Sequence, residues 1–137
     1  MDTGLELTAK RANNLNACVN CLFADNRRGA IRLRGNGSTL IANSDFVRNE
    51  GNPLIDSDQP VGIVSSRFVA GSSGSMLDAD AICEACRFQS AAGSQATIAR
   101  AGVRVILLDS EASMPLGANA SGCWSIAASP AVRTRAC

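Results

Sequence analysis

The stretch LIANSDF, residues 40–46, decides the fold, because the chain repeats it in outline three more times. All four phenylalanines of the chain end such a stretch: ACVNCLF at 17–23, LIANSDF at 40–46, GIVSSRF at 62–68 and AICEACRF at 81–88. A nearly fixed period of roughly 20–23 residues predicts a repeat architecture in which each unit is one turn of a larger structure.

Each repeat carries the same kind of side chain at the same distance from its phenylalanine. Five positions before it the residue is apolar: Cys18, Ile41, Ile63 and Cys83. Three positions before it the residue is small or an amide: Asn20, Asn43, Ser65 and Ala85. Two positions before it the residue is small: Cys21, Ser44, Ser66 and Cys86. A second apolar column is expected eight positions after it: Ile31, Leu54, Met76 and Ala96.

Segments rich in Gly, Asn and Ser separate these apolar positions, so each unit reads as two or three short strands joined by turns. Short strands at this period predict a parallel β-solenoid, because a β-propeller needs a longer period and a leucine-rich repeat needs more Leu. Neighbouring turns of a solenoid lie about 4.8 Å apart, so each position meets its own counterpart. We therefore expect Phe to stack on Phe, and the amides of Asn20 and Asn43 to form a ladder at a tight turn.

Residues Leu15 to about Leu108 resemble the right-handed parallel β-helix of the pectin-lyase-like superfamily, most closely its degenerate "isnStFxxN" repeats of surface and extracellular proteins. The resemblance implies the right-handed coil and a surface or extracellular location. The expected fold is an all-β, single-stranded right-handed parallel β-helix (β-solenoid) of about five to six rungs, each of roughly 20–23 residues. Residues 1–14 would form an N-terminal cap, 15–116 the rungs, and 117–137 a degenerate last rung with a C-terminal cap or tail.

Composition excludes several functions. The 137 residues include no His, so Ser-His-Asp, Cys-His and His-containing zinc sites are impossible. A net charge of +1 gives no electrostatic reason to expect nucleic-acid binding. No apolar run is long enough for a transmembrane segment, and the opening residues lack the apolar centre of a secretory signal. The His- and Lys-containing catalytic sets of pectin-lyase-like enzymes are not recognisable, so we expect no enzyme.

Four aspartates are the candidate site. Asp56 and Asp78 lie ten residues after their phenylalanines, and Asp58 and Asp80 lie twelve after. If the register holds, the four carboxylates meet on one face with Arg100 in the next rung. The pattern leaves three interpretations open: solvated strand ends, a calcium site, or an acid/base pair for glycoside hydrolysis.

Cysteines form two CxxC motifs, Cys18 with Cys21 and Cys83 with Cys86. The repeat places the two motifs about 14 Å apart, so neither one metal ion nor one disulfide joins them. Buried thiols that pack as small apolar residues are the interpretation that the columns favour, and a bridge within either motif stays open. Cys123 and Cys137 are a candidate bridge for the tail.

Two further features concern surfaces. Arg27, Arg28, Arg32 and Arg34 form a basic cluster that could bind an acidic partner or a polysaccharide. A solvated face is the simpler interpretation, with the acids Asp25, Asp45 and Glu50 expected nearby. Trp124 is a candidate cap for the last rung.

We therefore expect a non-catalytic structural or binding module that docks by its ends onto partners or copies of itself. The alternative is a carbohydrate-active β-helix, polysaccharide-binding or lyase-like, that uses the aspartate face, with or without calcium.

Overall fold

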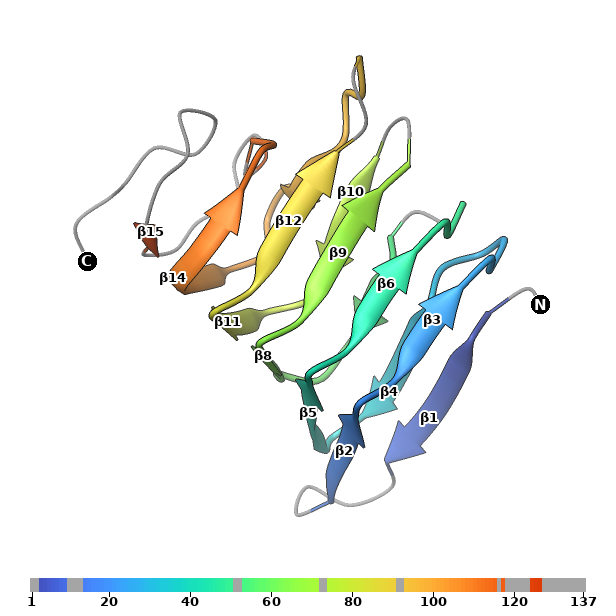
Figure 1. The fold of residues 1–137 in the computed structure, drawn as a ribbon. Helices are drawn as coiled ribbons and strands as arrows, with labels where there is room; N and C mark the ends of the chain where they lie inside the picture. Colours follow the sequence, from blue (N-terminus) through green and yellow to red (C-terminus); the bar gives the residue numbers. More distant parts are fainter. Residues whose placement is uncertain are drawn as a thin grey trace.

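A computed structural model describes residues 3–9, 14–50, 53–71, 74–90, 93–115, 117 and 124–126. Throughout these residues the chain is an all-β parallel solenoid without a helix (Figure 1). Successive register partners along one column are Leu5, Ile31, Ile55, Leu77 and Ala99. This column marks out about four turns of the solenoid, each of roughly 23 residues.

Three parallel sheets, here named A, B and C, form the sides of the solenoid. Sheet A contains β1 (Leu5–Ala9), β4 (Ile31–Gly35), β7 (Ile55–Ser57), β10 (Ser75–Asp78) and β13 (Thr97–Ala99). Sheet B contains β2 (Leu15–Val19), β5 (Ser38–Ala42), β8 (Val61–Val64), β11 (Ala81–Glu84), β14 (Val105–Ala112) and β15 (Trp124–Ile126). Sheet C contains β3 (Leu22–Ala24), β6 (Asp45–Val47), β9 (Arg67–Ala70), β12 (Arg87–Ser90) and the end of β14.

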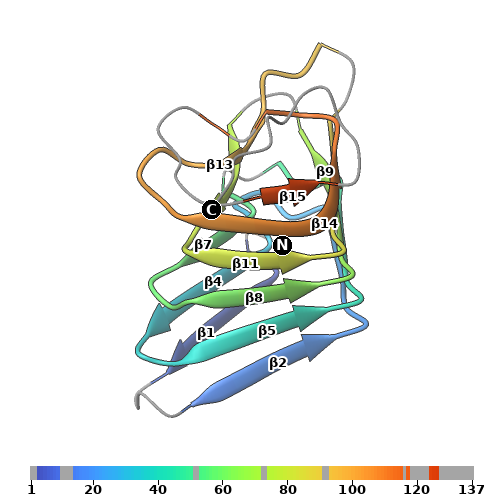
Figure 2. The ribbon, with the colours of Figure 1, turned by 90° about the vertical axis from the view of Figure 1, so that its left-hand side faces the viewer.

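Figure 2 shows the strands of sheet B in sequence order from β2 to β14, with β15 beside β14. Residues 5–9, which lie in the segment predicted to form an N-terminal cap, form β1 at one edge of sheet A. In the part of the chain that the structure describes, no helix is long and apolar enough to span a membrane.

The phenylalanine column is confirmed. Phe23, Phe46, Phe68 and Phe88 stack with ring centroids 4.9, 4.5 and 5.0 Å apart and nearly parallel rings. The column five residues earlier also holds, because Ile41, Ile63 and Cys83 are register partners and all three are fully buried. The core is therefore made of like side chains stacked rung upon rung, which follows directly from the parallel register.

The turn between sheets B and C repeats one backbone conformation. Asn20, Asn43, Ser65, Ala85 and Asp109 all have positive φ, between 46° and 57°. The next residue holds the turn by a hydrogen bond from its side chain to the carbonyl two residues before it, as in Ser44 to Ala42 (2.8 Å) and Ser66 to Val64 (3.0 Å). Backbone amides also donate to the hydroxyl of the next rung, as in Ser44 to Ser66 (3.1 Å).

The expected amide ladder lies at a different corner. Asn20 and Asn43 are exposed, whereas Asn26 and Asn49 are buried behind the phenylalanine column. The Asn49 side-chain oxygen accepts from the backbone and side-chain nitrogens of Asn26, at 3.1 and 2.8 Å. The Asn49 amide then donates to the Phe23 carbonyl at 2.9 Å, which satisfies the polar groups of a buried turn.

The second apolar column needs a correction. Ile31 pairs with Ile55 rather than Leu54, and the pairing of Ser75 with Thr97 places Ile98, rather than Ala96, opposite Met76. The register therefore places Ala30, Leu54, Met76 and Ile98 in one column, and all four are buried. The prediction assumed a constant distance from Phe, but the connection from sheet C to sheet A varies in length between rungs.

Candidate binding surface on sheet B

Sheet B is apolar on its outer face as well as its inner one. The outward column through the strand centres contains Ala17, Leu40, Gly62, Ile82 and Ile106. The next outward column contains Val19, Ala42, Val64, Glu84 and Leu108. Exposed fractions reach 53% for Ile82 and 51% for Val19. A sheet that is apolar on both faces is typical of a sheet that is covered on both sides.

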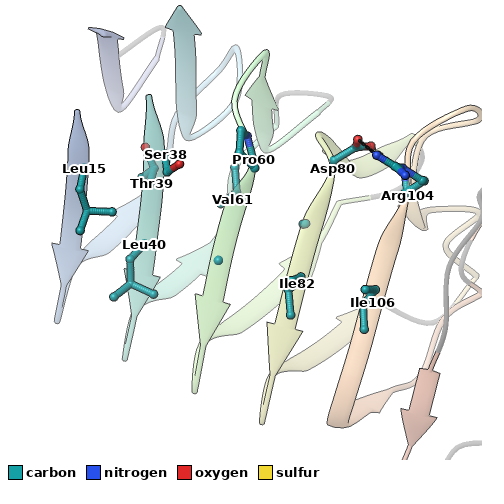
Figure 3. A pocket seen from close by; sticks show the side chains of 12 residues that line it. Leu15, Ser38, Thr39, Leu40, Pro60, Val61, Asp80, Ile82, Arg104 and Ile106 are labelled. Atoms are coloured by element: carbon teal, nitrogen blue, oxygen red, sulfur yellow. Dashed lines mark hydrogen bonds and ion pairs between the residues drawn. The ribbon is translucent and has the colours of Figure 1, made fainter. Parts of the chain in front are cut away.

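A shallow hollow of about 760 Å³ lies over this face, with Leu40 and Ile82 on either side of Gly62. Gly62 has no side chain between them, and an added Cβ would only reach ordinary contact with Leu40, at 3.6 Å. Figure 3 shows Asp80 and Arg104 at the start of their strands, where they form an ion pair of 3.3 Å beside the hollow. The site is thus an apolar depression with a single charged pair at its rim.

The outer face of sheet A is charged in register. Its central column contains Glu6, Arg32, Asp56, Asp78 and, one rung further, Arg100. Arg34 donates two hydrogen bonds to Asp56, at 3.0 and 2.6 Å, and Arg100 pairs with Asp78. The hydrogen bonds from Arg34 lower the pKa of the Asp56 carboxyl, an effect that partial burial opposes. The same contact raises the pKa of Arg34.

The outer face of sheet C also carries ion pairs between neighbouring rungs. Asp45 pairs with Arg67 at 3.0 Å, and Arg87 pairs with Glu111 at 2.9 Å. At the adjoining corner, Asp25 and Arg48 form a two-point contact at 2.8 Å. Two of the three outer faces therefore carry several ion pairs between rungs, whereas the strand centres of sheet B carry none.

The four candidate aspartates are only partly brought together. Asp56 and Asp78 are register partners as expected, whereas Asp80 lies at the edge of the hollow on sheet B. Asp58 lies 3.7 Å from Arg34. Among the described residues, no three His, Cys, Asp or Glu side chains gather as metal ligands. Calcium binding stays a prediction, and an ion would have to displace guanidinium groups from Asp56 and Asp78.

The cysteines divide into two states. Cys18 and Cys21 form a disulfide, so the interpretation of Cys18 as a buried packing thiol is wrong. The short turn places the two Cα atoms 6.2 Å apart, within the range that a disulfide spans. Cys83 and Cys86 are free and buried, as the packing interpretation expected. Cys123 and Cys137 lie outside the described residues, as do the side chains of Lys10 and Trp124.

The basic cluster is split by the strands. Arg32 and Arg34 lie on sheet A and face Asp56, with Glu6 4.0 Å from Arg32. Two of the three acids expected nearby have other partners, because Asp25 pairs with Arg48 and Asp45 with Arg67. Half of the cluster is thus part of the ion-pair face of sheet A.

The sequence interpretation missed the outer face of sheet B, although a signal was present. Leu40 precedes inward Ile41, Ile82 precedes inward Cys83, and Ile106 precedes inward Leu107. Two apolar residues in succession on a short strand indicate that both faces are apolar, whereas a strand with one wet face alternates.

Comparison of the chain with protein-family models, with curated proteins and with solved structures gives no match.

Proposed function

We propose that this chain is a non-catalytic structural module that pairs with a second copy of itself through the outer face of sheet B. The observation that carries the proposal is the pair of outward columns on five successive strands, in which Glu84 is the single charged residue. Exposure of such an apolar face to water is unfavourable, and contact with a second apolar face removes both faces from water. A second copy supplies that match without a further partner.

The contrast between the three sheets supports this choice of face. Ion pairs such as Arg34–Asp56 on sheet A and Arg87–Glu111 on sheet C are partly exposed to solvent and already have their partners. Covering them would remove charges from water with little return. On sheet B the two outward columns carry one charge, Glu84, so covering this face costs less. In the proposed dimer, Leu40 or Ile82 of one copy fills the hollow over Gly62 of the other. Packing of sheet on sheet is a common way to cover such faces.

The size of the face sets the strength of the association. Five strands about 4.8 Å apart and about five residues long give a face of roughly 400 Å². Two copies then bury roughly 800 Å², which is below the size of a standard interface. We therefore expect a weak dimer that forms at high protein concentration, or one strengthened by further contacts at the ends of the solenoid.

The ends remain candidates for those contacts. Strands β1, β2 and β3 pair on one side only within the described residues. Leu15 and Leu22 on β2 and β3 are 76% and 68% exposed. Open strand edges of this kind add further strands readily, so docking by an end stays part of the proposal.

The location belongs to the proposal as well. Disulfides persist in oxidising compartments, so the Cys18–Cys21 bridge supports a surface or extracellular protein. The sequence repeats resemble those of the right-handed pectin-lyase-like β-helix, and a non-catalytic member of that kind is the form we propose. The carbohydrate-active alternative needs carboxylates such as Asp56 and Asp78 to be available, but both are held by arginines.

Light scattering over a range of protein concentrations tests the proposal. The wild-type chain should rise in mean mass towards twice the monomer, whereas Ile82→Lys should stay monomeric, because it places a charge in the centre of the interface. Val69→Lys is the matched control, since Val69 lies beside the charged column of sheet C. The control should associate like the wild type.

A wild-type chain that stays monomeric at millimolar concentration would overturn the proposal. Equal loss of association in Ile82→Lys and Val69→Lys would overturn the choice of face. Calcium and acidic oligosaccharides, added separately, should leave the mean mass and the melting temperature unchanged. A calcium-dependent rise in melting temperature that Asp78→Ala abolishes would instead support the alternative.

A further inference from the structure

The two CxxC motifs occupy equivalent places in the solenoid. Cys18 pairs in register with Ile41, Ile41 with Ile63, and Ile63 with Cys83, so both motifs begin in the same inward column. The third residue of each motif has the same left-handed conformation, with φ of 57° at Asn20 and 53° at Ala85. The backbone that allows the Cys18–Cys21 disulfide therefore occurs again at Cys83 and Cys86.

The two free sulfurs of the second motif are neighbours. The Cys83 thiol donates a hydrogen bond to the Cys86 sulfur, which raises the pKa of Cys83, as burial also does. The same hydrogen bond lowers the pKa of Cys86, an effect that burial opposes. Cys86 also donates to the carbonyls of Ile63 and Glu84, each at 3.4 Å. Both side chains are buried, with exposed fractions of 0% and 2%. Bond formation therefore needs side-chain rotation but no new course of the backbone.

Cys86 occupies a turn position that serine fills in other rungs. In neighbouring rungs Ser44, Ser66 and Ser110 stand in this place and hold the turn by one hydrogen bond to the carbonyl two residues earlier. Cys86 makes the same contact, so a thiol serves as well as a hydroxyl there. What distinguishes the rung is the second cysteine at Cys83, where two other rungs have Ile41 and Ile63.

We propose that Cys83 and Cys86 are a second disulfide site, which closes by exchange with a small disulfide such as oxidised glutathione while the chain folds. The Cys86 thiolate attacks one sulfur of the glutathione disulfide, forms a mixed disulfide and releases a glutathione thiolate. The Cys83 sulfur then attacks Cys86 and releases the second glutathione. Two cysteine thiols are oxidised, one glutathione disulfide is reduced, and the two thiol protons end on the two glutathiones.

Burial explains why the exchange belongs to folding. In the finished solenoid no oxidant reaches sulfurs that are fully enclosed, because exchange requires the attacking thiolate to meet a disulfide in line. A chain that folds in a reducing medium therefore keeps the dithiol, and one that folds in an oxidising medium closes the bridge. The inference rests on the fold and is independent of the proposed assembly.

Trypsin separates the two motifs and makes the test direct. Cleavage at arginine yields residues 12–27, which contain Cys18 and Cys21, and residues 68–87, which contain Cys83 and Cys86. The reduced, unfolded protein is refolded with oxidised and reduced glutathione, alkylated, digested and analysed by mass spectrometry. Both peptides should lack alkyl groups and weigh two hydrogens less than the dithiols. Folded, reduced protein in the same buffer should close 68–87 at least tenfold more slowly.

Three results would overturn the proposal: a doubly alkylated 68–87 peptide in refolded samples where 12–27 is bridged, Cys83 or Cys86 joined to another peptide, or equal rates in folded and refolding protein. Cys86→Ser is the matched control, because serine holds this turn in neighbouring rungs. It should fold with an unchanged circular-dichroism spectrum, bridge 12–27 as before, and leave one alkylated thiol in 68–87.

Discussion

At the scale of single residues, the solenoid depends on polar side chains that satisfy buried turns. Asn49 is 3% exposed and serves three groups at once, the backbone and side-chain nitrogens of Asn26 and the carbonyl of Phe23. The stacked phenylalanines exclude water from this corner, so these groups have few other partners. One amide therefore joins two rungs by polar contacts beside the packed phenylalanine column.

Asn49→Ala should lower the free energy of unfolding by about 1–3 kcal/mol, because it leaves buried polar groups without partners. Urea unfolding monitored by circular dichroism measures the loss. Asn43→Gly is the control: Asn43 is exposed with φ of 49°, a conformation that glycine adopts freely. The control should stay within about 0.5 kcal/mol of the wild type. Equal losses in both variants would show that the amide ladder contributes nothing specific.

At the scale of the strands, sequence reasoning succeeded where one residue type marked one column. The four phenylalanines lie in one stack because each sits at the same distance from a turn of constant conformation. It failed eight residues further on, where connections of unequal length shift the register of Ile31 and Ala96. Insertions in such loops cost little, so their lengths are not fixed by the repeat.

The candidate site was harder to predict for a related reason. The spacing correctly placed Asp56 beside Asp78 with Arg100 in the next rung, but it did not show that Arg34 pairs with Asp56. The apolar outer face of sheet B was not predicted either, because the repeat pattern identifies the inward column of Ile41 and Ile63 and not the outward residues beside it. Only the register shows that Leu40, Gly62 and Ile82 form a column of their own.

The ion pairs of sheet A predict an acid-dependent stability. Arg34 lowers the folded-state pKa of Asp56 below its ordinary value of 3.8. The contribution of this pair is therefore present above the unfolded-state value and is lost as the pH falls through the lower folded-state value. The urea midpoint of the wild type should decrease as the pH is lowered below 3.8. Asp56→Asn should have a lower midpoint at neutral pH and a smaller decrease in acid.

Asp25→Asn is the control for this prediction, because the Asp25–Arg48 pair is exposed to solvent, which screens its contribution. Its urea midpoints should follow those of the wild type closely at every pH. An acid transition of unchanged steepness in Asp56→Asn would show that other carboxyls govern it.

At the scale of the whole molecule, the solenoid presents three sides of unequal chemistry. Sheets A and C carry ion pairs between rungs, whereas sheet B carries apolar columns on both of its faces. The solenoid therefore has one side with an exposed apolar surface and two sides on which ion pairs face the solvent. The pairing that we propose, of sheet B with its counterpart in a second copy, would cover that side.

Cross-linking at Gly62 tests this pairing most directly. β8 is the middle of the five main strands of sheet B, so a two-fold axis through the face passes near Gly62. Paired sheets lie about 10 Å apart, which a short bis-maleimide spans. With Cys123 and Cys137 replaced by serine, Gly62→Cys should give a covalent dimer, and Val69→Cys on sheet C should not. Monomer alone from Gly62→Cys, or equal dimer from both variants, would contradict the account.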